Sequence, residues 1–376
     1  MTRIAIFCDG TWNSPDIFEP THVARLSSAL VSDPAKGQVA AYFSGIGTDT
    51  RFDGTVGKFL NKWGGGAFGW GLDAKVKQAY QFIARIYRPK DRLYVFGFSR
   101  GAYTARSVVG MIRKCGIVAD TSEAGINAAF DLYRLRGDRG HPDHPNVQAA
   151  RAAMSPGFAT SQADMDARDG SGAAMVDVAF VGVWDTVGAR GIPPSLLGPV
   201  ATLWNRQYRF HDMQLSSLVR RARHAVALDE MRVFYRPALW SNLDGAKGLN
   251  RDDVSATRAY QQMWFIGNHS IIGGSAGVRE LSAFPLEWIL KGAPELALKP
   301  GVRVPPVKGD AAMDSALMLA KLGVLSRWRS GPRFARDIHG SVRVRIEARH
   351  DYRPGSLREV DRDTVSPAPR PSGHDR

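Results

Sequence analysis

Short apolar runs alternate with amphipathic stretches through the first third of the chain, and this alternation constrains the fold more than any other feature. The apolar runs end in turns, as residues 4–8 do at Asp9-Gly10, and this indicates buried strands. Strands are expected at 4–8, 39–43 and 92–96, and helices at 22–31, 72–87 and 100–114. This order predicts an α/β fold: a mainly parallel sheet flanked by helices.

The remainder of the chain continues this pattern with interruptions. Strands are expected at 176–183 and 262–266, and helices at 215–227, 281–290 and 311–329. Residues 136–171, which have no clear period, are expected to form an inserted helical or loop excursion. We therefore expect one domain, with a disordered tail. Its parts are an α/β domain over 1–357, the insertion at about 136–171, a cap at about 192–227, and a basic, proline-rich tail at 358–376.

Positive charge is in strong excess. The composition is that of a globular protein, with 44% hydrophobic and 23% charged residues, but the formal net charge is +14. Such an excess favours contact with polyanions, either anionic lipid headgroups or nucleic acid. Because no nucleic-acid-binding motif accompanies the charge, we expect no nucleic-acid partner and favour peripheral contact with an anionic membrane surface.

Several classes of protein are excluded by features that the sequence lacks. Its two cysteines, Cys8 and Cys115, cannot form a disulfide framework. The first residues contain no signal-peptide core, and no apolar stretch reaches the roughly 20 residues that span a bilayer. His141 and His144 have no carboxylate or cysteine at a spacing that suits a metal. We expect no metal and no cofactor, and a cytoplasmic protein or one exported without a Sec signal peptide.

The pentapeptide Gly97-Phe98-Ser99-Arg100-Gly101 fits G-x-S-x-G, a sharp turn that lifts a serine from the end of a strand onto the start of a helix. The pattern alone is weak, but here an expected strand precedes it and an expected helix follows it. A serine hydroxyl needs a base to act as a nucleophile, and the base needs a third group to orient it. Ser99 is therefore the candidate nucleophile.

The acid and the base should follow Ser99 in the order acid, histidine. Asp185 ends the expected strand 176–183, at the edge where such sheets place their sites, and Asp229 is its main competitor. His269 lies between a short strand and paired glycines and is the candidate base. His224 falls in an apolar pattern typical of a helix, so a core or supporting role is expected for it.

A developing oxyanion needs backbone N–H donors, and two places in the sequence could supply them. Arg100 begins the helix after Ser99, so its backbone N–H is the first candidate. The loop after the first strand is the second, with Gly10 and Thr11 as donors and Asp9 as a supporting residue. A simple tight turn explains Gly10 equally well.

Six blocks of the sequence carry a family resemblance. They are Phe7–Asn13, Tyr42–Gly47, Gly97–Arg106, Val183–Gly188, His224–Glu230 and Trp264–Gly274, with Ile338–Val342 as a late block. In order, they resemble the blocks of the uncharacterised α/β-hydrolase family of bacteria and fungi that includes the phospholipase effectors of type VI secretion. The resemblance runs from about residue 3 to about 357. It implies a Ser-Asp-His triad, which falls on Ser99, Asp185 and His269, and hydrolysis of lipid esters.

One position departs from the family pattern. The family's loop tends to read His-Ser-Asp, whereas this chain reads His269-Ser270-Ile271. Any support that this Asp gives the histidine in relatives is therefore absent here.

Two functions of different classes fit these observations. The first is a serine hydrolase that cleaves carboxylic esters, of lipids or small molecules, through an acyl-enzyme intermediate. The alternative is a non-catalytic module on a hydrolase scaffold that binds nucleic acid or a protein partner. The sequence specifies no head group, no acyl length, and no immunity or secretion partner.

Overall fold

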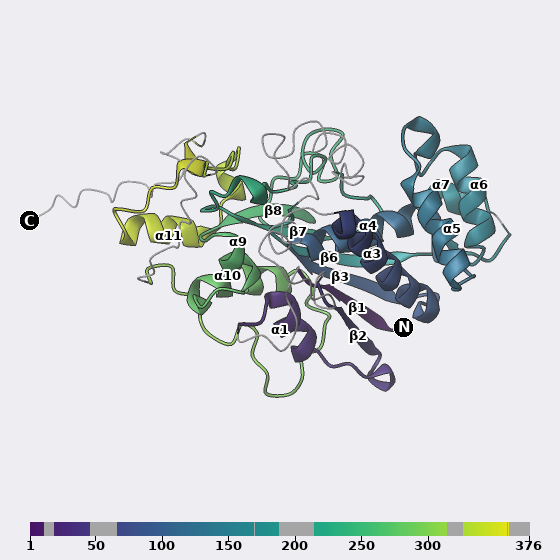
Figure 1. Ribbon diagram of the computed structural model, residues 1–376, viewed down its shortest axis with the longest axis horizontal. Coiled ribbons are helices and arrows are strands. Elements are labelled where there is room, and N and C mark those ends of the chain that lie inside the picture. The colour runs from purple at the N-terminus through teal and green to yellow at the C-terminus, as the bar shows by residue number, and fades with distance from the viewer. Residues whose placement is uncertain are drawn as a thin grey trace, which may run out of the picture.

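The computed structural model describes residues 1–10, 19–45, 66–168, 170–187, 214–313, 326–358 and 360. A six-stranded sheet lies at its centre, in the order β2-β1-β3-β6-β7-β8, and every neighbouring pair of strands is parallel (Figure 1). The strands are β1 (Arg3–Cys8), β2 (Gln38–Phe43), β3 (Arg92–Phe98), β6 (Asp177–Trp184), β7 (Ala222–Ala227) and β8 (Tyr260–Phe265). The predicted α/β fold with a mainly parallel sheet is confirmed.

Different helices cover the two faces of this sheet (Figure 1). Successive side chains of a strand point to opposite faces. In β1, Ile6 packs in the apolar cluster on the α3 and α4 side, and Phe7 packs in the cluster on the α1 and α10 side. Both faces are buried, which is why the strands lack a polar and apolar alternation. The helices are α1 (His22–Ala29), α3 (Gly66–Ile86), α4 (Arg100–Cys115) and α10 (Arg279–Leu290).

The helix predicted at 215–227 is wrong. Residues 222–227 are β7, which pairs with β6 on one side and β8 on the other, and 215–221 form turns and irregular chain. A short apolar run that is buried on both sides cannot be told from a buried helix by its periodicity. The same strand shows that the cap expected at about 192–227 does not include 222–227. Residues 192–213 lie outside the described residues.

The expected excursion at 136–171 is folded against the end of α4. It follows α5 (Glu123–Arg134) and contains α6 (Pro145–Met154) and α7 (Gln162–Asp166), which lie together at one end of the molecule (Figure 1). Strand β4 (Phe158–Ala159) pairs with β5 (Ala174–Met175). The buried carboxylate of Asp164 accepts hydrogen bonds from Arg151 and Arg168, each at 2.8 Å, and joins α7 to α6.

The C-terminal segment packs beside β8. It contains α11 (Gly340–Ala348), and the backbone N–H of His339 donates to Trp264 O at 2.9 Å. The helix predicted at 311–329 is not seen at its described ends, because residues 311–313 and 326–329 are not helical, and 314–325 lie outside the described residues. The expected tail also lies outside them, apart from residues 358 and 360. Within the described ranges, no helix has both the length and the apolar character needed to cross a bilayer.

Candidate active site

Ser99 sits on a strained turn between β3 and α4. Its φ is 57° and its ψ is −120°, a positive φ that residues other than glycine rarely adopt. A Cβ at Gly97 would lie 2.5 Å from Gly101 O, and a Cβ at Gly101 would lie 2.1 Å from Cys8 O. Both glycines are therefore required by the close approach of strand and helix. The side chain of Ser99 does not cap α4, so its Oγ remains available for other contacts.

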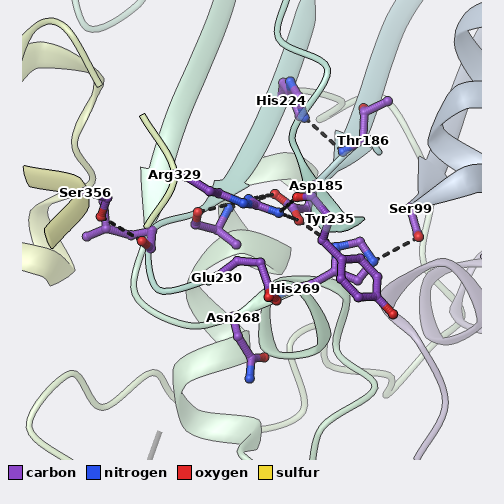
Figure 2. Close-up of polar contacts among 12 residues, drawn as sticks. Ser99, Asp185, Thr186, His224, Glu230, Tyr235, Asn268, His269, Arg329 and Ser356 are labelled. Carbon is purple, nitrogen blue, oxygen red and sulfur yellow. Dashed lines mark hydrogen bonds and ion pairs between the residues drawn. The ribbon is translucent and has the colours of Figure 1, made fainter. Parts of the chain in front are cut away.

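His269 begins the short helix α9 (His269–Gly273) and faces Ser99 across the carboxyl edge of the sheet (Figure 2). Its Nε2 lies 2.9 Å from Ser99 Oγ, and its Nδ1 lies 2.5 Å from Asp185 Oδ2. The imidazole contacts two aromatic rings in tilted arrangements, with centroids 4.7 Å away at Phe98 and 4.5 Å away at Tyr235. The ring is thus fixed in plane and in direction.

Asp185 follows β6 and is fully buried. Its Oδ1 accepts the backbone N–H of Ala227 at 2.9 Å and Arg329 Nη1 at 2.6 Å, and its Oδ2 accepts Arg329 Nη2 at 2.8 Å in addition to the contact with His269. All acceptor positions of the carboxylate are therefore used. The structure brings together Ser99, Asp185 and His269, which the sequence analysis selected from three distant parts of the chain.

The surroundings lower the pKa of both the acid and the base. Burial raises the pKa of Asp185, but the charge and hydrogen bonds of Arg329, together with those of His269, outweigh burial and hold this pKa well below its usual range. Burial lowers the pKa of His269, and Asp185 and Glu230 offset only part of that effect. At neutral pH, Asp185 is therefore anionic and His269 is neutral. With the Nδ1 proton donated to Asp185, Nε2 can accept the Ser99 proton.

The backbone of the histidine loop is held by three polar side chains. Glu230 Oε2 accepts the His269 N–H at 3.1 Å, and the side chain of Asn268 accepts the Ile271 N–H at 3.1 Å. Asp229 Oδ2 accepts the Gly267 N–H at 2.7 Å, and Tyr352 donates its hydroxyl to the same carboxylate. Asp229 therefore contacts the loop backbone, whereas the imidazole itself is bonded to Asp185.

His224 supports the acid from β7. Its Nε2 accepts the backbone N–H of Thr186 at 3.1 Å (Figure 2). Its Nδ1 lies 3.0 Å from Gln262 Oε1. Burial lowers the pKa of His224 to about 3, so the ring is neutral and can accept the Thr186 proton. His224 thus orients the turn that carries Asp185.

The two expected sources of oxyanion donors are the start of α4 and the loop after β1. Arg100 is the first residue of α4, where backbone N–H groups point out of the helix end. Gly10 donates its N–H to Asp9 Oδ1 at 2.6 Å. The other oxygen of Asp9 accepts the hydroxyls of Thr21 at 2.6 Å and Tyr42 at 2.7 Å. Asp9 therefore stabilises the loop and occupies the Gly10 donor. Thr11 lies outside the described residues.

Sequence reasoning missed two charged residues of the site. Glu230 was visible only as the end of a family block, and Arg329 had no motif and lay in a segment predicted to be helical. Arg329 is 144 residues from Asp185, so no local pattern could have joined them. Among the described residues, no group of three or more His, Cys, Asp or Glu side chains could hold a metal ion.

A comparison with protein families decides the family. The sequence profile of the family described as "T6SS, Phospholipase effector Tle1-like, catalytic domain" matches residues 2–292. The chain belongs to this family. The matched span contains the six strands of the central sheet and the residues Ser99, Asp185 and His269. Arg329 lies beyond it.

Individual relatives are longer than this chain. An uncharacterized protein of Saccharomyces cerevisiae, YEL023C, is 28% identical over 240 residues, which are 61% of this chain and 31% of the yeast protein. Two solved structures are each 18% identical over 74% of this chain: an uncharacterized protein from Pseudomonas aeruginosa, with a TM-score of 0.35, and the Tle1 effector bound to the VgrG spike of the type VI secretion system, with a TM-score of 0.40. The chain covers 42% and 52% of those two chains.

Proposed function

We propose that this Tle1-like chain is a serine hydrolase that cleaves carboxylic esters of lipids, phospholipids foremost, through an acyl-enzyme intermediate. Ser99 is the proposed nucleophile, His269 the base and Asp185 the group that orients the base. The observation that carries the proposal is the unbroken series of hydrogen bonds from Ser99 Oγ through the two nitrogens of His269 to Asp185 Oδ2, at 2.9 Å and 2.5 Å.

The proposed reaction has two halves. Ser99 Oγ attacks the ester carbonyl carbon while His269 Nε2 takes the hydroxyl proton, and the carbonyl oxygen becomes an oxyanion. Collapse of this intermediate breaks the carbon–oxygen bond of the ester, and the alkoxide leaves with the proton from His269. A water molecule, deprotonated by the same nitrogen, then attacks the acyl-enzyme and releases the carboxylic acid and free Ser99.

The proposed oxyanion donors come from the start of α4 and from the loop after β1. The Arg100 N–H is the first donor, because it follows the nucleophile at a helix N-terminus. Since the N–H of Gly10 is already donated to Asp9, Thr11 is the remaining candidate of that loop.

Family and charge support a lipid substrate. The family is one of phospholipase effector catalytic domains, and the net charge of +14 would attract anionic headgroups with about 1 kcal/mol for each well-placed basic residue. We further propose one domain over 1–357 that acts after export and contacts an anionic membrane surface peripherally.

The test is labelling with a fluorophosphonate probe, followed by hydrolysis assays on p-nitrophenyl esters and on vesicles of defined phospholipids. We expect wild-type protein to be labelled and to release fatty acid, and Ser99→Ala to do neither. Ser28→Ala, at an exposed serine of α1, is the matched control and should behave as wild type. A well-folded wild-type protein that takes up no probe and cleaves no ester would contradict the proposal and favour a non-catalytic binding module.

A further inference from the structure

Arg329 reaches the site from a segment that the family match does not cover. Ser326 bridges to Arg232 in the antiparallel sense, and the Arg327 N–H donates to Met231 O at 2.7 Å. This pairing sets the direction of the side chains that follow. Arg329 is buried, with 5% of its surface exposed, whereas the side chain of Arg327 points to solvent.

The contact between Arg329 and Asp185 is a two-point ion pair (Figure 2). Nη1 lies 2.6 Å from Oδ1 and Nη2 lies 2.8 Å from Oδ2, so the guanidinium and the carboxylate meet along parallel hydrogen bonds. The same two nitrogens also donate to Ala227 O, at 3.1 Å, and to Tyr235 O. Neither group can rotate without breaking several bonds.

Among the described residues, the charged side chains that act on His269 include two carboxylates and the guanidinium of Arg329. The carboxylates are Asp185, which accepts the Nδ1 proton, and Glu230, which accepts the backbone N–H. Each carboxylate is matched by one guanidinium, Arg329 for Asp185 and Arg232 for Glu230, the latter at 2.7 Å. Each of these two carboxylates is thus paired with its own guanidinium. The carboxyl group of Asp229 also contacts the histidine loop, through a backbone N–H, and burial raises its pKa to about 6. An additional proton on the imidazole is therefore stabilised by the carboxylates and opposed by the guanidiniums.

We propose that Arg329 is a positioning residue of this site: it fixes the carboxylate of Asp185 against His269 and keeps the imidazole in its neutral, proton-accepting form. The inference rests on the proposed function. It adds a role for a residue whose hydrogen bonds in the described structure go to Asp185 and to two backbone carbonyls.

The proposed role has two separable parts, charge and alignment. In a Ser-His-Asp site the carboxylate holds the tautomer of the histidine and stabilises the imidazolium that forms during reaction. The positive charge of Arg329 reduces that stabilisation, so the histidine stays unprotonated to lower pH, as the burial and the Arg329 charge that lower its pKa both indicate. The two-point contact aligns the carboxylate, and a lysine, with its single ammonium group, cannot reproduce it.

Three variants separate these parts. Arg329→Met removes the charge and keeps most of the length, Arg329→Lys keeps the charge and removes the fork, and Arg327→Met is a matched control on the exposed side of the same segment. The pKa of His269 is measured by NMR of protein with ¹³C-labelled histidine, with the signal assigned by its loss in His269→Gln. The pH profile of kcat/KM is measured on a soluble p-nitrophenyl ester, and its acidic limb reports the same group.

We expect Arg329→Met to raise the pKa of His269 measured by NMR by about one unit, and the pKa of the acidic limb of the kcat/KM profile by the same amount. At pH values below this limb, the fraction of active enzyme should then be about tenfold lower than in wild type. Arg329→Lys should leave the pKa near that of wild type and still lower kcat/KM, and Arg327→Met should change neither.

An unchanged pKa in folded Arg329→Met would overturn the charge part, and an unchanged kcat/KM in Arg329→Lys would overturn the alignment part. If Arg329→Met fails to fold, Arg329→Lys still tests the charge part, because lysine keeps the positive charge. A His269 pKa that rises by about one unit in Arg329→Lys would then overturn the charge part. If wild type shows no Ser99-dependent hydrolysis, the proposed function fails, but the NMR titrations still decide whether Arg329 controls the protonation of His269.

Discussion

Replacing Asp185 by Asn tests the ion pair and the proposed site together. The carboxylate is fully buried and accepts one backbone N–H, two guanidinium hydrogen bonds and the imidazole hydrogen bond. An amide has one acceptor oxygen in place of two and no charge. Asp185→Asn therefore turns an N–H group toward Arg329 or toward His269 and leaves the guanidinium buried without a counter-ion.

Two effects of different size should follow from this single change. Removing one partner of a buried ion pair lowers the free energy of unfolding by about 3–5 kcal/mol. Loss of the correct histidine tautomer lowers kcat by about 10⁴ in other sites of this type. The double variant Asp185→Asn with Arg329→Met contains no unpaired cation. Its free energy of unfolding should be about 2–3 kcal/mol higher than the sum of the two single effects predicts. It should regain no activity.

The assay is a double-mutant cycle. Urea unfolding of wild type, both single variants and the double variant gives the coupling energy, and hydrolysis of a soluble ester gives the rates. A coupling energy within about 0.5 kcal/mol of zero would refute the ion pair. An Asp185→Asn enzyme that keeps most of its activity would refute the assignment of Asp185.

Two further predictions concern the turn at Ser99 and the competing acid. Gly101→Ala places a Cβ 2.1 Å from Cys8 O and 2.4 Å from Asp9 O, both of which are backbone atoms. We therefore expect a lower melting temperature and a free energy of unfolding that is lower by about 1–3 kcal/mol or more. The control Gly277→Ala, whose Cβ would have no atom within 4 Å, should leave both unchanged. Burial raises the pKa of Asp229 from 3.8 to about 6, so the folded protein holds a proton there that the unfolded chain releases, and stability should fall as the pH rises through that window. Asp229→Asn should flatten this decline in urea titrations and keep most of the hydrolytic rate, and a rate loss equal to that of Asp185→Asn would make Asp229 the acid.

The parts of the molecule that could be predicted are those with a local signature. The turn at Ser99 has glycines on both sides because other backbone atoms leave no room for a Cβ at Gly97 or Gly101. Five consecutive residues are therefore enough to predict it. Asp185 and His269 were found because each stands at the carboxyl end of an expected strand. Parallel strands deliver their ends to one edge of the sheet, which is why three separate local signals converged.

The parts that could not be predicted depend on tertiary contacts. β7 contains Arg223 and His224 among small apolar residues, and its pairing with β6 and β8 overrides a pattern that suggested a helix. The Gly10 N–H was expected to face an oxyanion, but the carboxylate of Asp9 competes for it from the preceding residue. Arg329 carries no motif, and only the folded chain brings it to Asp185.

The departure from the family pattern at Ile271 is consistent with this balance of charges. Ile271 is buried with Leu228 and Trp264 in an apolar cluster, and its Cγ2 lies 2.6 Å from the position of a Cβ at Gly267, where φ is +115° and only glycine fits. Apolar packing therefore fixes the first turn of α9 against the core. An Asp at this position would add a carboxylate to a loop that already contacts those of Asp185, Asp229 and Glu230. The side chain of Ile271 instead packs in the apolar cluster and adds no charge beside His269.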